Sequence, residues 1–86
     1  MRVSLPALAA VLIAAPALVA APARADDKAA CADGIGMIRM ELAKNPAEPL
    51  LGKLKKALRV AEREQGEGEF DECLDAVGDA QRALKP

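Results

Sequence analysis

Hydrophobic residues recur at helical spacing in three stretches of the chain, at about 27–44, 49–65 and 69–84. No stretch alternates apolar and polar residues as a strand does, so the pattern predicts three amphipathic helices. Each helix is expected to turn one stripe toward a shared core. The stripes comprise Cys31, Ile35, Ile38 and Leu42, then Leu50, Leu51, Leu54, Leu58 and Ala61, and finally Phe70, Cys73, Leu74, Val77, Gln81 and Leu84.

Two short segments separate these stretches. Residues 45–49 contain two prolines and residues 66–68 contain two glycines. Proline is accepted in the first turn of a helix but not in its interior, and glycine commonly follows a helix end. Because short connections make neighbouring helices antiparallel, the first and third helices are expected to run in parallel. The predicted fold is all-α, a small up-down-up three-helix bundle.

The first 25 residues have the pattern of a secretory signal peptide. Arg2 precedes an apolar run that reaches Ala23, and Ala23-Arg24-Ala25 fits the small-x-small cleavage rule. Cleavage after Ala25 is preferred, with cleavage after Ala23 as the alternative. Three prolines make the run a poor membrane anchor, so we expect no stable membrane insertion. The alanine-rich leader is typical of bacteria, which predicts a periplasmic protein with one domain at 26–86.

Cys31 and Cys73 are the two cysteines of the chain, and export places them in an oxidising compartment. Each lies about four residues into its predicted helix, the first and the third, so the two thiols are expected at the same height. There is no C-x-x-C motif. We therefore predict a structural Cys31–Cys73 disulfide rather than a redox-active pair.

The composition excludes several classes of function. The chain has no His, Trp or Tyr, and Phe70 is its one aromatic residue. Without His, catalytic triads, zinc hydrolysis and haem–His ligation are excluded. Without aromatic platforms, and with a formal net charge of −1, nucleic acid is not an expected partner. A domain this small offers little room for a substrate pocket, so we expect no enzyme activity.

The charges of the second predicted helix run against its dipole. Residues 53–59 hold four bases and no acid, whereas 62–79 hold eight acids and one base, Arg63. A helix is stabilised by acids near its start and bases near its end, so this order is the unfavourable one. The simplest account is a solvated charged surface. A ligand of opposite charge at either cluster would also remove the conflict.

The acidic cluster suggests a hard cation. Carboxylate oxygens without His or thiolate ligands suit calcium, or a lanthanide of similar radius. The spacing is not that of an EF-hand, because Glu72 falls where glycine is required and Gly78 where the closing Glu belongs. The candidate ligands, in a turn and a first helical turn, are Glu67, Glu69, Asp71, Glu72 and Asp75.

The exported leader, the tiny helical chain, the cysteine pair and the acidic turn at 67–72 together resemble one known group. These are the small periplasmic lanthanide-binding proteins encoded in the lanthanide-uptake clusters of methylotrophic bacteria, distinct from the EF-hand protein lanmodulin. The resemblance covers about six residues and the overall character of the chain. It implies a surface site with few protein ligands, metal-bridged dimers and a partner in metal trafficking.

The basic cluster supports a different hypothesis. Lys53 and Lys56, with Arg63, lie on one side of the second predicted helix, and Lys55 and Arg59 lie on another. Such a surface would dock an acidic partner, another periplasmic protein or an anionic lipid, without metal. The sequence thus leaves two non-enzymatic functions open, hard-cation binding and docking of an acidic partner by a disulfide-linked helical module.

Overall fold

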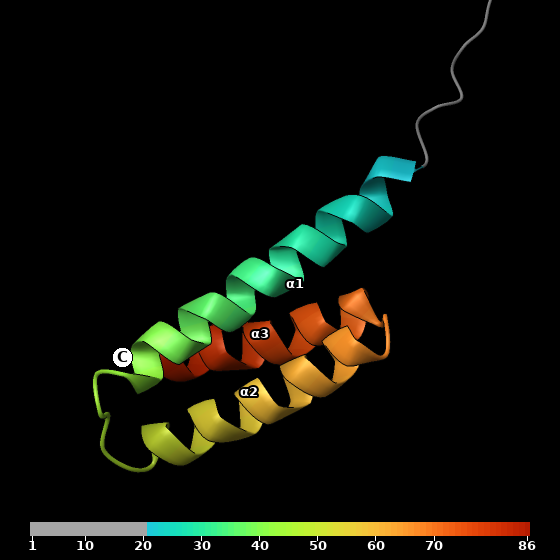
Figure 1. Ribbon diagram of the computed structural model, residues 1–86. Coiled ribbons are helices and arrows are strands. Elements are labelled where there is room, and N and C mark those ends of the chain that lie inside the picture. Colours follow the sequence, from blue (N-terminus) through green and yellow to red (C-terminus); the bar gives the residue numbers. More distant parts are fainter. Residues whose placement is uncertain (1–20) are drawn as a thin grey trace, which may run out of the picture.

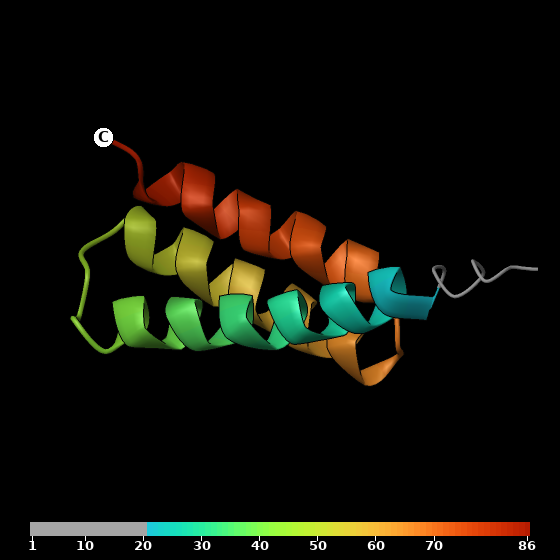
Figure 2. The same cartoon turned by 90° about the horizontal axis from the view of Figure 1, so that it is seen from above.

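The computed structural model describes residues 21–86, with side chains from Ala25 onward. It contains three helices, α1 (Ala21–Leu42), α2 (Leu50–Gly66) and α3 (Phe70–Leu84), and no strand within the described residues. α1 and α3 run in one direction and α2 in the other (Figure 1). The 43–49 connection and the C-terminus share one end of the bundle, and the 67–69 turn lies at the other (Figure 2). The predicted up-down-up three-helix bundle is confirmed.

The helices α2 and α3 begin and end within one residue of their predicted limits. α1 differs, because it begins at Ala21 rather than near residue 27. Alanine and arginine are good helix formers, and Pro22 lies in the first turn, where its missing N–H costs no hydrogen bond. Most of the predicted signal peptide, residues 1–20, lies outside the described residues.

α1 ends at a tightened turn. The backbone N–H of Lys44 donates to the carbonyl oxygen of Glu41 at 3.1 Å, and that of Asn45 donates to Leu42 at 3.0 Å. Asn45 has a φ of 54°, a left-handed conformation that asparagine tolerates better than most residues. The chain then turns into α2 through 46–49.

The turn between α2 and α3 is only three residues long and is fixed by backbone hydrogen bonds. The N–H of Gly68 donates to Gln65 at 3.1 Å, and the N–H of Glu69 donates to Glu64 at 2.9 Å. Gly68 has a φ of 77°, so it supplies the left-handed residue that commonly closes a helix. The acidic residues of this turn are therefore held on a defined backbone.

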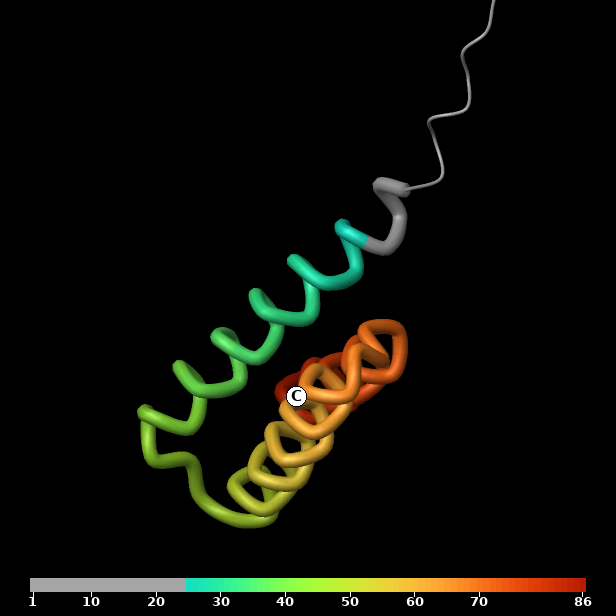
Figure 3. Tube along the Cα trace, turned by 45° about the vertical axis from the view of Figure 1, so that its right-hand side comes forward, coloured from blue at the N-terminus to red at the C-terminus, as the bar shows by residue number. Residues whose placement is uncertain are grey.

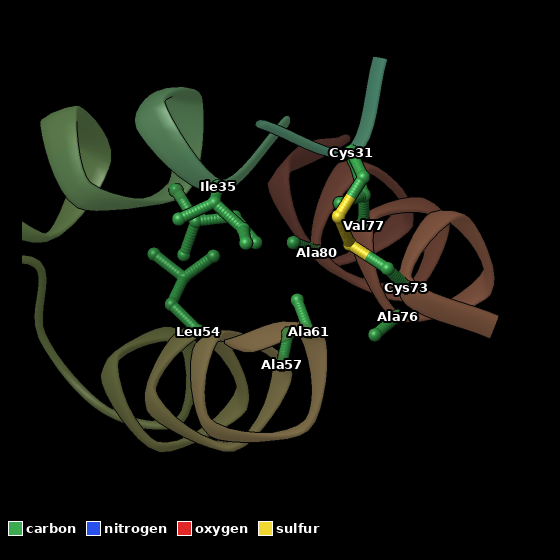
Figure 4. Packing of buried hydrophobic residues seen from close by; sticks show 10 residues of the cluster. Cys31, Ile35, Leu54, Ala57, Ala61, Cys73, Ala76, Val77 and Ala80 are labelled. Carbon is green, nitrogen blue, oxygen red and sulfur yellow. A yellow bond between two sulfur atoms is a disulfide. The ribbon is translucent and has the colours of Figure 1, made fainter. Parts of the chain in front are cut away.

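The core consists of small side chains between α2 and α3 and larger ones toward α1 (Figure 4). Ala57, Ala61, Ala76 and Ala80 are buried, and α2 and α3 contact each other more extensively than either contacts α1. Gln81 was assigned to the core stripe from the sequence but is exposed. The buried set is Cys31, Ile35, Ile38, Leu54, Ala57, Ala61, Cys73, Ala76, Val77 and Ala80.

The Cys31–Cys73 disulfide is confirmed and joins α1 to α3, with 5.8 Å between the two Cα atoms. Both cysteines are fully buried, and Figure 4 shows their sulfur atoms bonded at the edge of the core. Since the bridge lies within the core, it fixes α1 against the α2–α3 pair. Within 21–86, none of the helices combines the length and the apolar character needed to cross a bilayer.

Candidate functional site

The predicted cation ligands lie at the end of the bundle formed by the α2–α3 turn. Glu67 follows the last residue of α2, and Glu69 precedes the first residue of α3. Asp71 and Glu72 are in the first turn of α3, and Asp75 is one turn beyond Asp71. All five side chains are exposed. The structure therefore brings the predicted ligands to one end of the molecule, on the surface.

Negative charge at this end is not balanced by neighbouring bases. The pKa of the Glu72 carboxyl is raised, chiefly by the negative charge of Glu64, then by partial desolvation and by the charges of Glu69, Asp71 and Asp75. Within 25–86 none of the five predicted ligands forms an ion pair. The ion pairs that do form are Arg39–Glu62, Lys44–Glu41, Arg63–Glu64 and Arg82–Asp79.

The acidic turn does not form a preassembled coordination sphere. In the part of the chain that the structure describes, no group of three or more Asp, Glu, Cys or His side chains is arranged to hold a metal ion. The Asp71 carboxylate accepts a hydrogen bond from the backbone N–H of Glu72 at 2.9 Å. Cation binding at this turn would require its exposed side chains to change conformation.

Glu64 is a further residue of this region that the sequence reasoning missed. Its side chain is largely buried at the end of α2, and its carboxylate accepts hydrogen bonds from the Arg63 guanidinium at 3.2 and 3.3 Å. The sequence did contain a signal, because Leu54, Ala57, Ala61 and Glu64 recur at three- and four-residue spacing. Glu64 is the acid that acts most strongly on Glu72.

The predicted partner-binding lysines occupy the first half of α2. Lys53, Lys55 and Lys56 are exposed, and none of them forms an ion pair with residues 25–86. Lys53 and Lys56 line a groove of about 220 Å³ between α2 and α3, whereas Lys55 does not. The structure therefore groups two of the three predicted lysines and separates the third.

The groove, hereafter the α2–α3 groove, has an apolar floor and charged rims. Its lining residues on α2 are Lys53, Lys56, Ala57 and Val60, and those on α3 are Ala76, Asp79 and Ala83. Asp79 is paired with Arg82 on its own helix, so it does not neutralise the lysines across the groove. A ligand with apolar groups and a carboxylate matches this surface.

No family model matches the chain, and no curated protein matches it. The fold defines a disulfide-linked three-helix bundle, and function has to be inferred from its two charged surfaces.

Proposed function

We propose that this protein is a non-enzymatic periplasmic binding module that docks an acidic protein partner in the α2–α3 groove, with Lys53 and Lys56 as the charged contacts. The observation that carries the proposal is the coincidence of an apolar concave surface with two lysines that have no ion-pair partner within 25–86. Docking at such a surface breaks no ion pair of the described chain.

The two parts of the groove have different roles in binding. Lysine charges attract an acidic partner over about 10 Å at moderate ionic strength and favour rapid association. The floor of Ala57, Val60 and Ala76 then gains free energy by removing apolar surface from water. Binding through both parts should weaken with added salt without disappearing.

The proposed periplasmic location agrees with the presence of the Cys31–Cys73 disulfide. A disulfide of this kind persists in oxidising compartments, and the leader pattern predicts export. The bridge joins α1 to α3, and the groove lies between α3 and α2.

The test uses a synthetic acidic amphipathic peptide in which Glu and Leu alternate at helical spacing, and its Gln-for-Glu counterpart as the neutral probe. Fluorescence anisotropy of the labelled peptides is measured against the folded, oxidised protein. We expect the acidic peptide to bind and the double variant Lys53→Glu with Lys56→Glu to bind it at least about tenfold more weakly.

The matched control is Lys55→Glu with Arg59→Glu, which makes the same charge change on the same helix outside the groove. It should weaken binding much less than the groove variant. Equal weakening by both pairs, or equal binding of the acidic and neutral peptides, would contradict a specific groove site.

A second function, binding of calcium or a lanthanide ion at the acidic turn, is supported by a separate observation. The pKa of the Glu72 carboxyl is raised by the negative charges around it, and none of the five predicted ligands forms an ion pair within 25–86. A hard cation would supply positive charge there, held by exposed carboxylates among Glu67, Glu69, Asp71, Glu72 and Asp75. The resemblance to lanthanide-binding proteins concerns the same turn.

Metal binding is tested by following the melting temperature during titration with calcium chloride and with lanthanum chloride. The hypothesis predicts stabilisation that EDTA reverses and that Glu69→Gln with Glu72→Gln abolishes. Asp33→Asn, an exposed acid on α1, is the control and should leave the response intact. A constant melting temperature up to millimolar ion would reject this function.

A further inference from the structure

The face that contains the α2–α3 groove carries opposite charges at its two ends. Lys53 and Lys56 lie at one end, and Ala57, Val60 and Ala76 form the middle. Glu67 continues the helical register of α2 with backbone angles of −89° and −1°. Residues 53, 60 and 67 are each seven apart, and seven residues are close to two helical turns, so all three fall on one stripe.

The α3 side of this face has an acid at each end, and Asp79, at the end that holds the lysines, is paired with Arg82. Asp79, Ala76 and Glu72 follow one another at three- and four-residue spacing, so Glu72 extends the groove-lining stripe toward the α2–α3 turn. The negative charge of Glu64, near the end of α2, is the largest cause of the raised pKa of the Glu72 carboxyl. The acidic end of the face therefore consists of Glu67 and Glu72, both exposed.

This charge order is self-complementary. Lys53 precedes Val60 by seven residues and Glu67 follows it by seven, a distance of about 10 Å along the helix axis in each direction. A two-fold axis through Val60, perpendicular to α2, would therefore bring Lys53 of one copy opposite Glu67 of another. Lys56 and Glu64 each lie four residues from Val60, so the same rotation brings Lys56 to the level of Glu64 at the acidic end of the second copy.

We propose that the acidic partner of the α2–α3 groove is a second copy of this chain, bound antiparallel about a two-fold axis at Val60. The proposal rests on the docking function proposed above and names its partner. Such an interface is isologous, so it closes as a dimer and does not extend into a fibre.

A second copy fits this face better than an unrelated acidic protein because it offers opposite charge to both the basic end and the acidic end of the face. Lys53, Lys56, Glu67 and Glu72 all lack ion pairs within the described chain. An unrelated acidic partner would neutralise the two lysines and leave the two acids repelling their neighbours. The antiparallel dimer brings the lysines of each copy to the acidic end of the other, and it covers the half-exposed Val60 at the axis.

The dimer is tested by sedimentation equilibrium of the oxidised protein in low salt with EDTA present, from micromolar to millimolar concentration. We expect a dimer in EDTA whose dissociation constant increases as salt is raised. The basic-end variant, Lys53→Glu with Lys56→Glu, and the acidic-end variant, Glu67→Lys with Glu72→Lys, should each be monomeric. Far-ultraviolet circular dichroism checks that both variants fold.

Mixing the two variants provides the decisive measurement. In the mixed dimer every glutamate of the first chain faces a lysine of the second, so an equimolar mixture should form a heterodimer although each component alone does not. The control, Lys55→Glu with Arg59→Glu, changes α2 outside the groove and should remain dimeric.

A wild-type mass equal to the monomer at every concentration would overturn the proposal, as would a dimer that forms only when metal is added or that survives both charge reversals. If the protein is monomeric and still binds the acidic peptide through Lys53 and Lys56, self-association fails and the docking function stands. If neither occurs, both fail.

Discussion

Of the two glycines in α1, Gly34 is the one that lies against α3. A Cβ atom at Gly34 would lie 2.6 Å from both methyl groups of Val77, which is itself buried in the core. Gly36, two residues further along α1, has nothing within 4 Å of the same position. The two glycines weaken α1 equally in intrinsic propensity, but only Gly34 permits helix contact.

Gly34→Ala is therefore expected to destabilise the protein by about 1–3 kcal/mol, because the branched Val77 side chain cannot move away from the added methyl group without disturbing the core. Gly36→Ala should stabilise it by up to about 1 kcal/mol through helix propensity alone. Urea unfolding of both variants gives the free energies. Equal effects of the same sign would show that α1 does not pack against α3 at Gly34.

Glu72 is the residue at which pH should act on stability. Its pKa is raised in the folded protein, first by Glu64, so the folded state binds more protons than the unfolded state above the ordinary carboxyl pKa of 4.5. Stability must then fall as pH rises through the interval between 4.5 and the raised value. At neutral pH the charged carboxylate opposes folding.

At a protein concentration at which the chain is monomeric, Glu72→Gln should consequently melt higher than the wild type at pH 7 in low salt, by about 1–2 °C, and the difference should disappear near pH 4. Thermal unfolding followed by circular dichroism at several pH values measures it. High salt should remove most of the difference, because exposed charges are screened. A variant that melts lower than the wild type at pH 7 would contradict the assignment.

At the scale of the helices, prolines and glycines predicted where the helices end, whereas alanines did not predict which positions are buried. The prolines at 45–49 and the glycines at 66–68 act through backbone geometry, which is why α2 and α3 were placed to within one residue. Cys73 and Val77 were predicted correctly, but Ala76 and Ala80 carry too little hydrophobic signal to be separated from surface alanines, so both were missed and the exposed Gln81 was included in the core stripe. Small residues here allow two helices to approach closely.

The candidate sites were predicted less completely than the helices, because they depend on how the helices pack together. Residue type and helix register identified the lysines and the acids, since charge is visible in the sequence. Helix register already separates Lys53 and Lys56 from Lys55, but the groove that Lys53 and Lys56 line depends on how α3 packs against α2. Burial of Glu64, which governs the pKa of Glu72, likewise depends on tertiary packing.

The disulfide determines how α1 is held against the other two helices. It closes a loop with a sequence separation of 42 residues. In the chain-entropy account such a cross-link stabilises the folded state by about 4 kcal/mol, a large part of the stability of so small a domain.

Replacing both cysteines, Cys31→Ala with Cys73→Ala, should lower the free energy of unfolding by about 4 kcal/mol. Guanidinium unfolding compares this variant with the oxidised wild type. Dithiothreitol should destabilise the wild type and leave the double variant unchanged, which is the control for effects of the reductant. A loss below about 1 kcal/mol would mean that the helix contacts alone hold α1 in place.

On the scale of the whole molecule, α1 lies along one side of the α2–α3 pair (Figure 3), and its first turns project beyond the turn that joins them (Figure 1). Residues 25–30 lie outside the core, and the first buried residue of α1 is Cys31. The proposed cleavage after Ala25 therefore falls inside α1, in a part that supports no core contact among the described side chains.

The exported protein should accordingly begin at Asp26, with a melting temperature within about 2 °C of a chain that begins at Ala21, because Cys31 is the first buried residue among the described side chains of α1. Intact-mass measurement of the protein recovered from the periplasm of an expressing bacterium identifies the first residue, and a start at Arg24 would indicate the alternative site. Recovery of the uncleaved chain in the membrane fraction would contradict export by a cleaved leader. A processed chain that melted far lower would show that the projecting turns of α1 contribute to the fold, which the burial pattern does not predict.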